Sequence, residues 1–336
     1  MSGARAAGAD EPRRIHRAPT PGDRVFRFLA SSMGMVSMLA IGATAVFLVY
    51  NARPALKSTG VVSFFVKSVW NPTAGRFGVG GLLIGTVMIA AVALIVALPI
   101  SLATAIFINE YAPARVRKGL VLVVDLLAAL PSLIFGMWGL FALQEHLVGP
   151  AQWLSDHLSA IPMFQTDQGA LLARSTFIGG VVVGIMVIPI ITSVSRDVMS
   201  QVPREQCEGA LALGGSRWGM IRDVILPFGR TGIIGATILG FGRALGETIA
   251  VALVVSIVFA PQAKILQAGG GSIAGMIATQ FGEANELARS ALVAAGLALF
   301  ILTLIVSLAA RAVVRRAAKR GAGGGSRFGW LKAKMA

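Results

Sequence analysis

The chain has 336 residues, of which 55% are hydrophobic and only 13% are charged. A mean hydropathy of +0.76 excludes a water-soluble globular protein, because such a protein exposes far more charge on its surface. The formal net charge of +15 does not indicate nucleic acid as a partner, since the basic residues lie between apolar stretches and at both ends of the chain. The composition predicts a polytopic protein of the lipid bilayer.

The chain divides into a tail, a hydrophobic domain and a second tail. Residues 1–23 are rich in Ala, Gly, Pro and Arg, and we expect a disordered basic tail there. A six-helix membrane domain is predicted over 24–312, followed by a basic, Gly-rich tail over 313–336. Within the domain, six apolar stretches reach the roughly 20 residues that a helix needs to cross a bilayer. These six predicted spans are 28–50, 82–108, 120–143, 177–195, 232–259 and 287–310.

The lysines and arginines indicate the orientation of the spans. Of the 30 in the chain, 22 lie in the two tails and in the second and fourth connections, whereas five lie in the other three connections. Cytoplasmic loops carry the excess of basic residues in membrane proteins. We therefore expect both termini, and the fourth connection at about 197–230, in the cytoplasm.

Glycines and prolines predict how the spans pack. Prolines inside the second, third and fourth predicted spans would each kink a helix. Residues 273–281 of the last outer connection keep helical spacing, and we expect a re-entrant or interfacial hairpin over 261–286. GxxxG pairs, which let membrane helices approach closely, are Gly81/Gly85, Gly180/Gly184 and Gly242/Gly246.

The fourth connection contains two short helical patterns. Residues 205–213 form the first, and Gly214 closes it because glycine takes positive φ at low cost. Ser216 is the candidate N-cap of a second helix over 217–226, which we expect Pro227 to stop. A compact pair of helices between two spans indicates a docking element for a partner.

Three charged residues, Asp125, Arg243 and Glu247, remain inside the predicted spans. Arg243 lies about eleven residues into its span, on the order of 16 Å along the helix and therefore near the midplane. The i, i+4 spacing puts Arg243 and Glu247 on one helix face, where each partly neutralises the other. Since a charge at the midplane is costly, we interpret the pair as an anion contact in a transport pathway. A structural ion pair is the alternative.

The same two residues suggest how an anion could be released. An arginine fork matches two oxygens of an oxyanion, and a pathway must release what it binds. We expect Glu247 to compete for Arg243 and so weaken the site. Asp125 lies within about two turns of the cytoplasmic end of its span. For Asp125, interfacial snorkelling and a gating or proton-coupled role both stay open.

Covalent chemistry is not predicted. The chain has no P-loop and no HExxH motif, and its three histidines lie outside the predicted spans, so ATP binding through a P-loop and protease sites are excluded. We expect no metal and no cofactor in this chain. The single cysteine, Cys207, excludes a disulfide scaffold, and we expect a small buried residue there.

The fourth connection resembles the cytoplasmic docking loop of ABC importer permeases. It carries E-x-A-x-x-x-G from residue 208, then nine residues, an aliphatic residue, any residue and L-P. In that family the loop sits in a groove of the ATP-hydrolysing subunit. Gly209 departs from the family's alanine at a cost of about 1 kcal/mol in helix propensity. The resemblance implies docking roles for Glu208, Gly209, Ala210, Gly214, Leu226 and Pro227.

Further segments are similar to the phosphate-specific ABC importer permease of the PstC type. The most specific is GRALGETIAV at 242–251, and WNP at 70–72 also matches. The resemblance implies the type I importer fold in a bacterial plasma (inner) membrane, with Arg243 and Glu247 acting in phosphate translocation. It also implies a heterodimer with a PstA-type sister permease, two ATP-binding subunits that hold ATP and Mg, and an extracytoplasmic phosphate-binding protein.

We therefore predict a non-catalytic permease subunit that moves inorganic phosphate into the cytoplasm. A permease for another oxyanion, such as sulfate or molybdate, is one alternative, because an arginine fork does not discriminate among oxyanions. A passive anion channel is another alternative, against which the docking loop argues.

Overall fold

The computed structural model describes residues 21–322, and most of these are helical. Two compact units follow each other along the chain, with the boundary after Phe47, inside the first helix. Most of the two predicted tails lies outside the described residues. Inside the described part, the first helix begins at Pro21 and the last helix ends at Ala322.

The elements follow one another with short connections. Up to the fourth predicted span they are α1 (Pro21–Thr59), α2 (Val61–Val66), β1 (Trp70–Asn71), β2 (Arg76–Phe77), α3 (Gly80–Ile106), η1 (Phe107–Tyr111), α4 (Ala114–Ala129), α5 (Ser132–Trp138), η2 (Gly139–Leu143), α6 (Gln144–His157) and η3 (Pro162–Phe164). The remaining elements are α7 (Thr176–Met199), α8 (Arg204–Ala212), α9 (Arg217–Met220), η4 (Ile221–Ile225), α10 (Leu226–Leu245), α11 (Ile249–Val254), α12 (Ile273–Gln280) and α13 (Glu286–Ala322).

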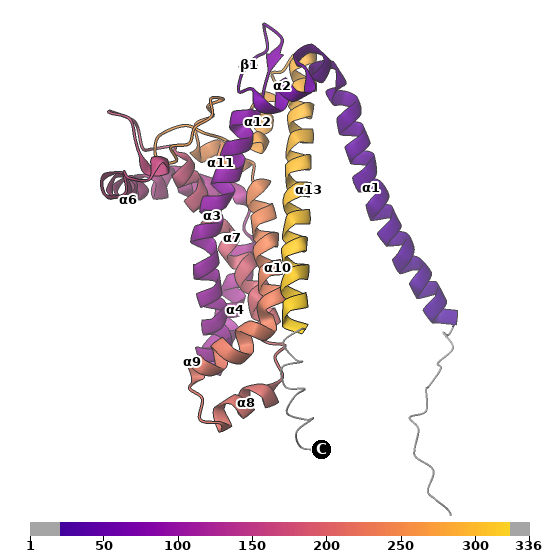
Figure 1. Ribbon diagram of the computed structural model, residues 1–336, viewed down its shortest axis with the longest axis vertical. Helices are drawn as coiled ribbons and strands as arrows, with labels where there is room; N and C mark the ends of the chain where they lie inside the picture. Colours follow the sequence, from indigo (N-terminus) through magenta and orange to yellow (C-terminus); the bar gives the residue numbers. More distant parts are fainter. Residues whose placement is uncertain (1–20, 323–336) are drawn as a thin grey trace, which may run out of the picture. The chain divides into compact units, whose positions relative to one another are not determined.

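Helices long and apolar enough to cross a membrane dominate the described chain, which confirms the prediction of an all-α membrane protein. Five segments meet this description, and one bent pair makes up to six. The segments are Pro21–Thr59, Gly80–Tyr111, Thr176–Met199, Arg217–Leu245 and Glu286–Ala312, and the pair is Ala114–Ala129 with Ser132–His157. Figure 1 shows α3, α7, α10 and α13 running alongside one another, with α8 and α9 at the end opposite β1 and α2.

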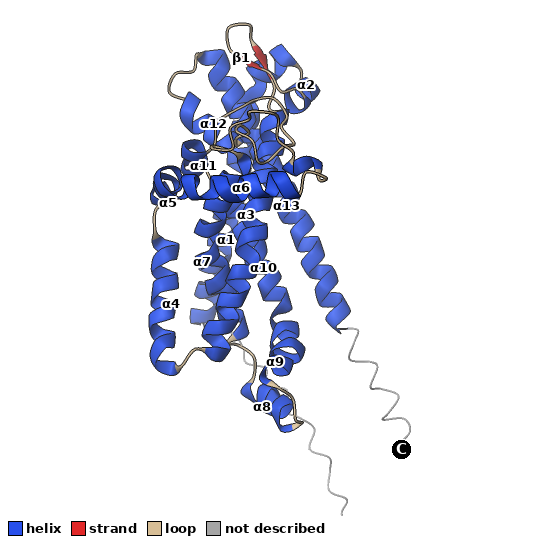
Figure 2. Cartoon of the chain, turned by 90° about the vertical axis from the view of Figure 1, so that its left-hand side faces the viewer, coloured by secondary structure: helices blue, strands red, loops and turns tan. Residues whose placement is uncertain are grey.

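The third predicted span, 120–143, is not one straight helix. α4 ends at Ala129, and the helices on either side of Pro131 differ in direction by 90°. Leu130 takes extended backbone angles (φ −64°, ψ 135°), because a residue before proline is pushed out of the α region. The proline therefore breaks the helix rather than only kinking it. After the break α6 runs across the long helices (Figure 2).

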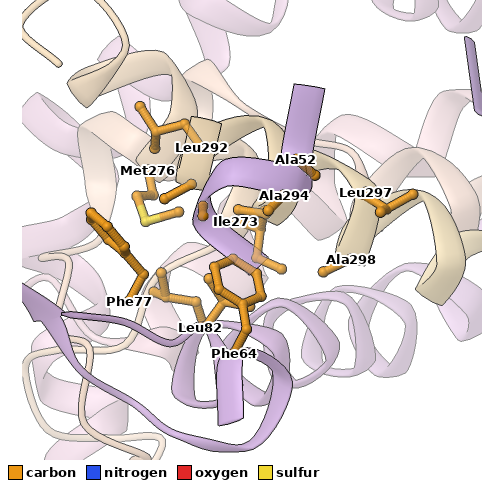
Figure 3. Packing of buried hydrophobic residues seen from close by; sticks show 14 of the residues in the cluster. Ala52, Phe64, Phe77, Leu82, Ile273, Met276, Leu292, Ala294, Leu297 and Ala298 are labelled. Carbon is orange, nitrogen blue, oxygen red and sulfur yellow. The ribbon is translucent and has the colours of Figure 1, made fainter. Parts of the chain in front are cut away.

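The end of the second unit that carries β1 and α2 is held together by an apolar cluster. Residues from six elements and the strand-to-helix connection meet there, and Figure 3 shows their side chains converging. Because these residues are almost fully buried, each contributes on the order of 1.5–3 kcal/mol for a large aliphatic or aromatic side chain. Its members include Ala52, Phe64, Phe77, Leu82, Ile273, Met276 and Leu292.

Two of the three GxxxG pairs are used for packing inside the chain. A Cβ at Gly85 would collide with the carbonyl oxygen of Gly271, and one at Gly180 would collide with Val92. At Gly242, by contrast, no other element lies within 4 Å of the Cβ position. The first two pairs therefore seat α3 and α7 against their neighbours, and the third leaves an open surface.

Replacing Gly85 with valine is expected to lower the yield of correctly folded protein several-fold. The new side chain would meet backbone, which cannot rotate away, so we expect a cost of about 3 kcal/mol. The yield is measured by size-exclusion chromatography in mild detergent. Gly119→Val on α4 is the control, because the Cβ there meets nothing within 4 Å. Equal yields of the two variants would contradict the packing described here.

Candidate functional site

The two candidate pathway charges lie at a break in the fifth predicted span. α10 ends at Leu245, with Gly246 as its C-cap, and α11 begins at Ile249. The prediction of one helix over 232–259 is therefore wrong, and so is the shared helix face of Arg243 and Glu247. Beyond Val254 the chain is irregular until α12, which lies inside the predicted outer hairpin as expected.

The side chain of Glu247 bonds to the start of the helix that follows this break. The residue is only 7% exposed, and its Oε1 accepts a hydrogen bond of 3.2 Å from the backbone N–H of Ala250. This bond satisfies one of the free donors at the start of α11, as capping side chains do. Glu247 therefore begins a new helix instead of extending α10.

Arg243 is in the last turn of α10, and its side chain is exposed. No ion pair or hydrogen bond of Arg243 is present among the described residues, so the predicted pairing with Glu247 is absent from this conformation. The C-terminus of a helix suits a cation. An anion that approaches Arg243 would therefore meet a guanidinium with free donors.

The depth of Arg243 restricts what can face it. Thirteen residues separate it from Arg230 on the same helix, which is about 20 Å at 1.5 Å per residue. Placing Arg230 at the edge of a hydrocarbon core of roughly 30 Å would put Arg243 well inside that core. An arginine there is expensive in lipid and faces a protein or a water-filled cavity. The neighbouring Gly242 and Gly246 leave this side of α10 uncovered within the chain.

The break in α10 lies against the other broken helix. A Cβ on Gly136, in α5, would lie 2.8 Å from the Cα of Ala250, in α11, so α5 and α11 approach almost backbone to backbone. Non-helical backbone is tolerated at membrane depth only when protein or a water-filled cavity surrounds it. The close contact of α5 with α11 covers the starts of these two helices, whereas Pro131 and Gly246 themselves stay exposed in the described chain.

Asp125 lies apart from this site and is joined to α7. Ser193 donates a hydrogen bond of 3.2 Å from Oγ to Oδ1 of Asp125. Arg196 contacts the same hydroxyl at 3.4 Å through Nη2 and forms an ion pair of 2.8 Å with Asp197. Sequence reasoning did not select Ser193 or Arg196, since a serine and an arginine at i, i+3 near a helix end carry little signal.

The fourth connection folds largely as predicted. Gly214 has a φ of +85°, and the Oγ of Ser216 accepts a hydrogen bond of 3.1 Å from the backbone N–H of Gly219. The prediction that Pro227 stops the second helix is wrong, because one continuous helix runs from Arg217 to Leu245. The π-helical turn η4 precedes the proline and moves aside the carbonyl with which its ring would collide.

α8 and α9 present an exposed surface at this end of the bundle. Cys207 and Ala210 pack inward against an apolar cluster that contains Met199 and Ile221, while Leu213 on the outer side is 91% exposed. Leu211 and Trp218 are exposed at the same tip, and several exposed apolar residues close together are typical of a protein interaction site. Of the other predicted docking residues, Glu208, Gly209 and Pro227 are exposed and Leu226 is half-buried.

Alkylation of Cys207 is expected to require a higher pH than alkylation of a free cysteine. Burial raises the pKa of this thiol, and the nearby carboxylates of Glu110 and Glu208 raise it further. A raised pKa keeps the thiol neutral and unreactive where a free cysteine is already partly thiolate. The rate of iodoacetamide labelling is measured against pH, with the denatured chain as reference. Matching pH profiles would contradict the partial burial of this thiol.

Comparison with known proteins gives the family. Residues 97–319 match the family described as "Binding-protein-dependent transport system inner membrane component". The chain is 39% identical over 297 residues to the "Phosphate transport system permease protein PstC 2" of Mycobacterium tuberculosis, covering 87% of this chain and 91% of the relative. It is 38% identical over 302 residues to a PstC of Xylella fastidiosa, covering 89% and 92%. The chain belongs to the PstC permease family.

Solved structures share the fold of this PstC-family chain. An alginate ABC importer chain gives a TM-score of 0.54 at 18% identity, covering 87% of this chain and 99% of that one. An inward-facing MetNI methionine transporter chain gives 0.51 at 16% identity, covering 71% and 95%. The predicted ABC importer permease fold is confirmed. The PstC-family chain is a non-catalytic inner-membrane component of an importer that works with ATP-binding subunits and a substrate-binding protein.

Proposed function

We propose that this PstC-family permease moves inorganic phosphate into the cytoplasm and that Arg243 contacts the anion. The observation that carries the proposal is an exposed arginine at the end of α10, in a helix long and apolar enough to cross a membrane, without an acidic partner among the described residues. A guanidinium with free donors can bind two oxygens of a phosphate. The relatives are themselves named as phosphate transport permeases.

The proposed orientation places both termini and the docking loop, built from α8 and α9, in the cytoplasm. Basic residues of the second and fourth connections gather at one end of the bundle, where Arg117, Arg204 and Arg217 line a common cavity of about 350 Å³. This clustering supports the positive-inside assignment. The same end would receive the ATP-binding subunits.

The proposed partners are a PstA-type sister permease, two ATP-binding subunits and an extracytoplasmic phosphate-binding protein. The uncovered face of α10 at Gly242 and Gly246 supports a second membrane subunit there, because small residues let helices approach closely. Together, the two permeases would enclose Arg243 in a pathway. This chain would hold no cofactor, and ATP and Mg would bind the partner subunits.

Phosphate release would involve Glu247. In this conformation Oε1 of Glu247 accepts a hydrogen bond from the backbone N–H of Ala250, and the carboxylate forms no ion pair with Arg243. A movement that unwinds the first turn of α11 would free Glu247 to pair with Arg243 and displace the anion. Asp125, bonded to Ser193, would hold α4 to α7 near the cytoplasmic end during such a movement.

Uptake of labelled phosphate by the reconstituted four-component importer tests the function. We expect labelled phosphate to accumulate inside the vesicles only when ATP is inside, at the cytoplasmic face of the importer, and the phosphate-binding protein is outside. ATP-independent flux would instead indicate a passive channel. Competition by sulfate or molybdate at equal concentration would indicate a different oxyanion as the substrate.

A further inference from the structure

An open groove runs along the start of α10, away from Arg243. Its volume is about 550 Å³, and most of its surface is apolar. One wall comes from α3 and the other from η4 and the first turns of α10. The apolar residues of the groove are Leu102, Leu226, Pro227, Ile233 and Ile234.

Two arginines, Arg222 and Arg230, flank this apolar surface. Both are exposed, and neither forms an ion pair or a hydrogen bond with another described residue. Eight residues of helix separate them, which is about 12 Å, so their long side chains can reach toward a common point. Asp223 follows Arg222 directly, but neighbouring helix residues point about 100° apart, and no ion pair joins the two in the described chain.

We propose that this groove binds one anionic phospholipid. An acyl chain would cover Leu102, Ile233 and Ile234, and the headgroup phosphate would lie between Arg222 and Arg230, leaving Leu226 and Pro227 to the docking loop. The combination favours a lipid over a free anion, because inorganic phosphate gains nothing from the apolar wall, whereas basic pockets beside membrane helices suit anionic headgroups. Arginine binds phosphate oxygens through a planar fork.

The position of the groove along the helix agrees with this ligand. Arg230 lies about 20 Å from Arg243 along α10, and Arg222 lies further toward α8 and α9, so both guanidiniums lie at the end of this apolar helix that carries the polar connection. Long basic side chains commonly place their charge at the headgroup level. A bound lipid would contact both α3 and the helix that joins the docking loop to Arg243.

Native mass spectrometry of the assembled importer in mild detergent tests the proposal. The complex is incubated with phosphatidylglycerol or with phosphatidylcholine, and the lipid retained per complex is counted. We expect preferential retention of phosphatidylglycerol, reduced at least several-fold in the double variant Arg222→Gln/Arg230→Gln. The variant Arg115→Gln/Lys118→Gln removes two exposed basic residues from α4 instead, and it should retain the lipid as the wild type does.

A second variant tests whether the groove binds a lipid or a free anion. Ile234→Trp fills the groove while leaving both arginines in place, so we expect it also to lose phosphatidylglycerol. Excess inorganic phosphate should not displace the lipid. Undiminished retention in Arg222→Gln/Arg230→Gln or in Ile234→Trp, or displacement by inorganic phosphate, would overturn the proposal. So would an efficient cross-link from Arg230→Cys to another membrane subunit, because protein would then cover the groove.

Discussion

Replacing Arg243 with alanine is expected to reduce ATP-driven phosphate uptake about ten- to a hundredfold, since losing charge-assisted hydrogen bonds to an anion costs roughly 1.5–3 kcal/mol. The side chain is exposed and forms no bond with another described residue, so its removal leaves no buried partner unsatisfied. The four-component complex should therefore assemble in normal amounts. Uptake of labelled phosphate and the yield of complex are measured on the same preparation.

Two further variants make this prediction specific. Arg243→Lys keeps the charge but loses the planar fork, and we expect uptake between that of the wild type and that of the alanine variant. Arg289→Gln removes an exposed arginine of α13 that lies over the ring of Phe281, and it should leave uptake unchanged. Near-normal uptake by Arg243→Ala in a fully assembled complex would remove Arg243 from the pathway.

Reversing the charge of Glu208 is expected to abolish recovery of the ATP-binding subunits with the permease. Glu208 is exposed on α8, beside a turn whose shape depends on Gly214 at φ +85°. Gly214→Val should have the same effect, because a side chain in the left-handed region costs about 1–2 kcal/mol and would displace the exposed Leu213. Co-purification on a tagged permease measures both variants.

Gly209→Ala provides the matched control for the docking loop. A Cβ at this position meets nothing within 4 Å, and alanine stabilises the helix by about 1 kcal/mol relative to glycine. We expect the ATP-binding subunits to be recovered at least as well as with the wild type. Full recovery with both Glu208→Arg and Gly214→Val would show that the ATP-binding subunits dock elsewhere.

Composition and local spacing were sufficient to predict the features that depend on neighbours in sequence. Apolar length gives most of the spans, and the cap at Ser216 and the left-handed turn at Gly214 follow from local backbone chemistry. The family resemblance pointed to Arg243 as the pathway arginine, and the structure leaves that residue exposed. Its chemical role stays a prediction for the uptake assay.

The sequence could not show the features that depend on contacts between distant residues. The sequence predicts one helix through residues 242–251, because a periodicity count does not detect that Glu247 accepts a bond from Ala250 at the start of a new helix. From the sequence, Pro227 is interpreted as a helix stop, whereas in the structure a π-helical turn precedes it and the helix continues. The bond between Asp125 and Ser193 joins residues 68 positions apart, and neither residue carries a motif.

One continuous helix from Arg217 to Leu245 connects the end that carries α9 directly to Arg243, so movement at one end is transmitted to the other. Twenty-nine residues form a helix of about 44 Å, and Arg243 lies about 39 Å from its start, so a tilt of about 5° about the end that carries α9 would shift Arg243 by roughly 3.4 Å. That displacement exceeds the length of a hydrogen bond. A small swing driven by nucleotide could thus swap the groups within reach of Arg243 while every helical bond along this helix stays intact.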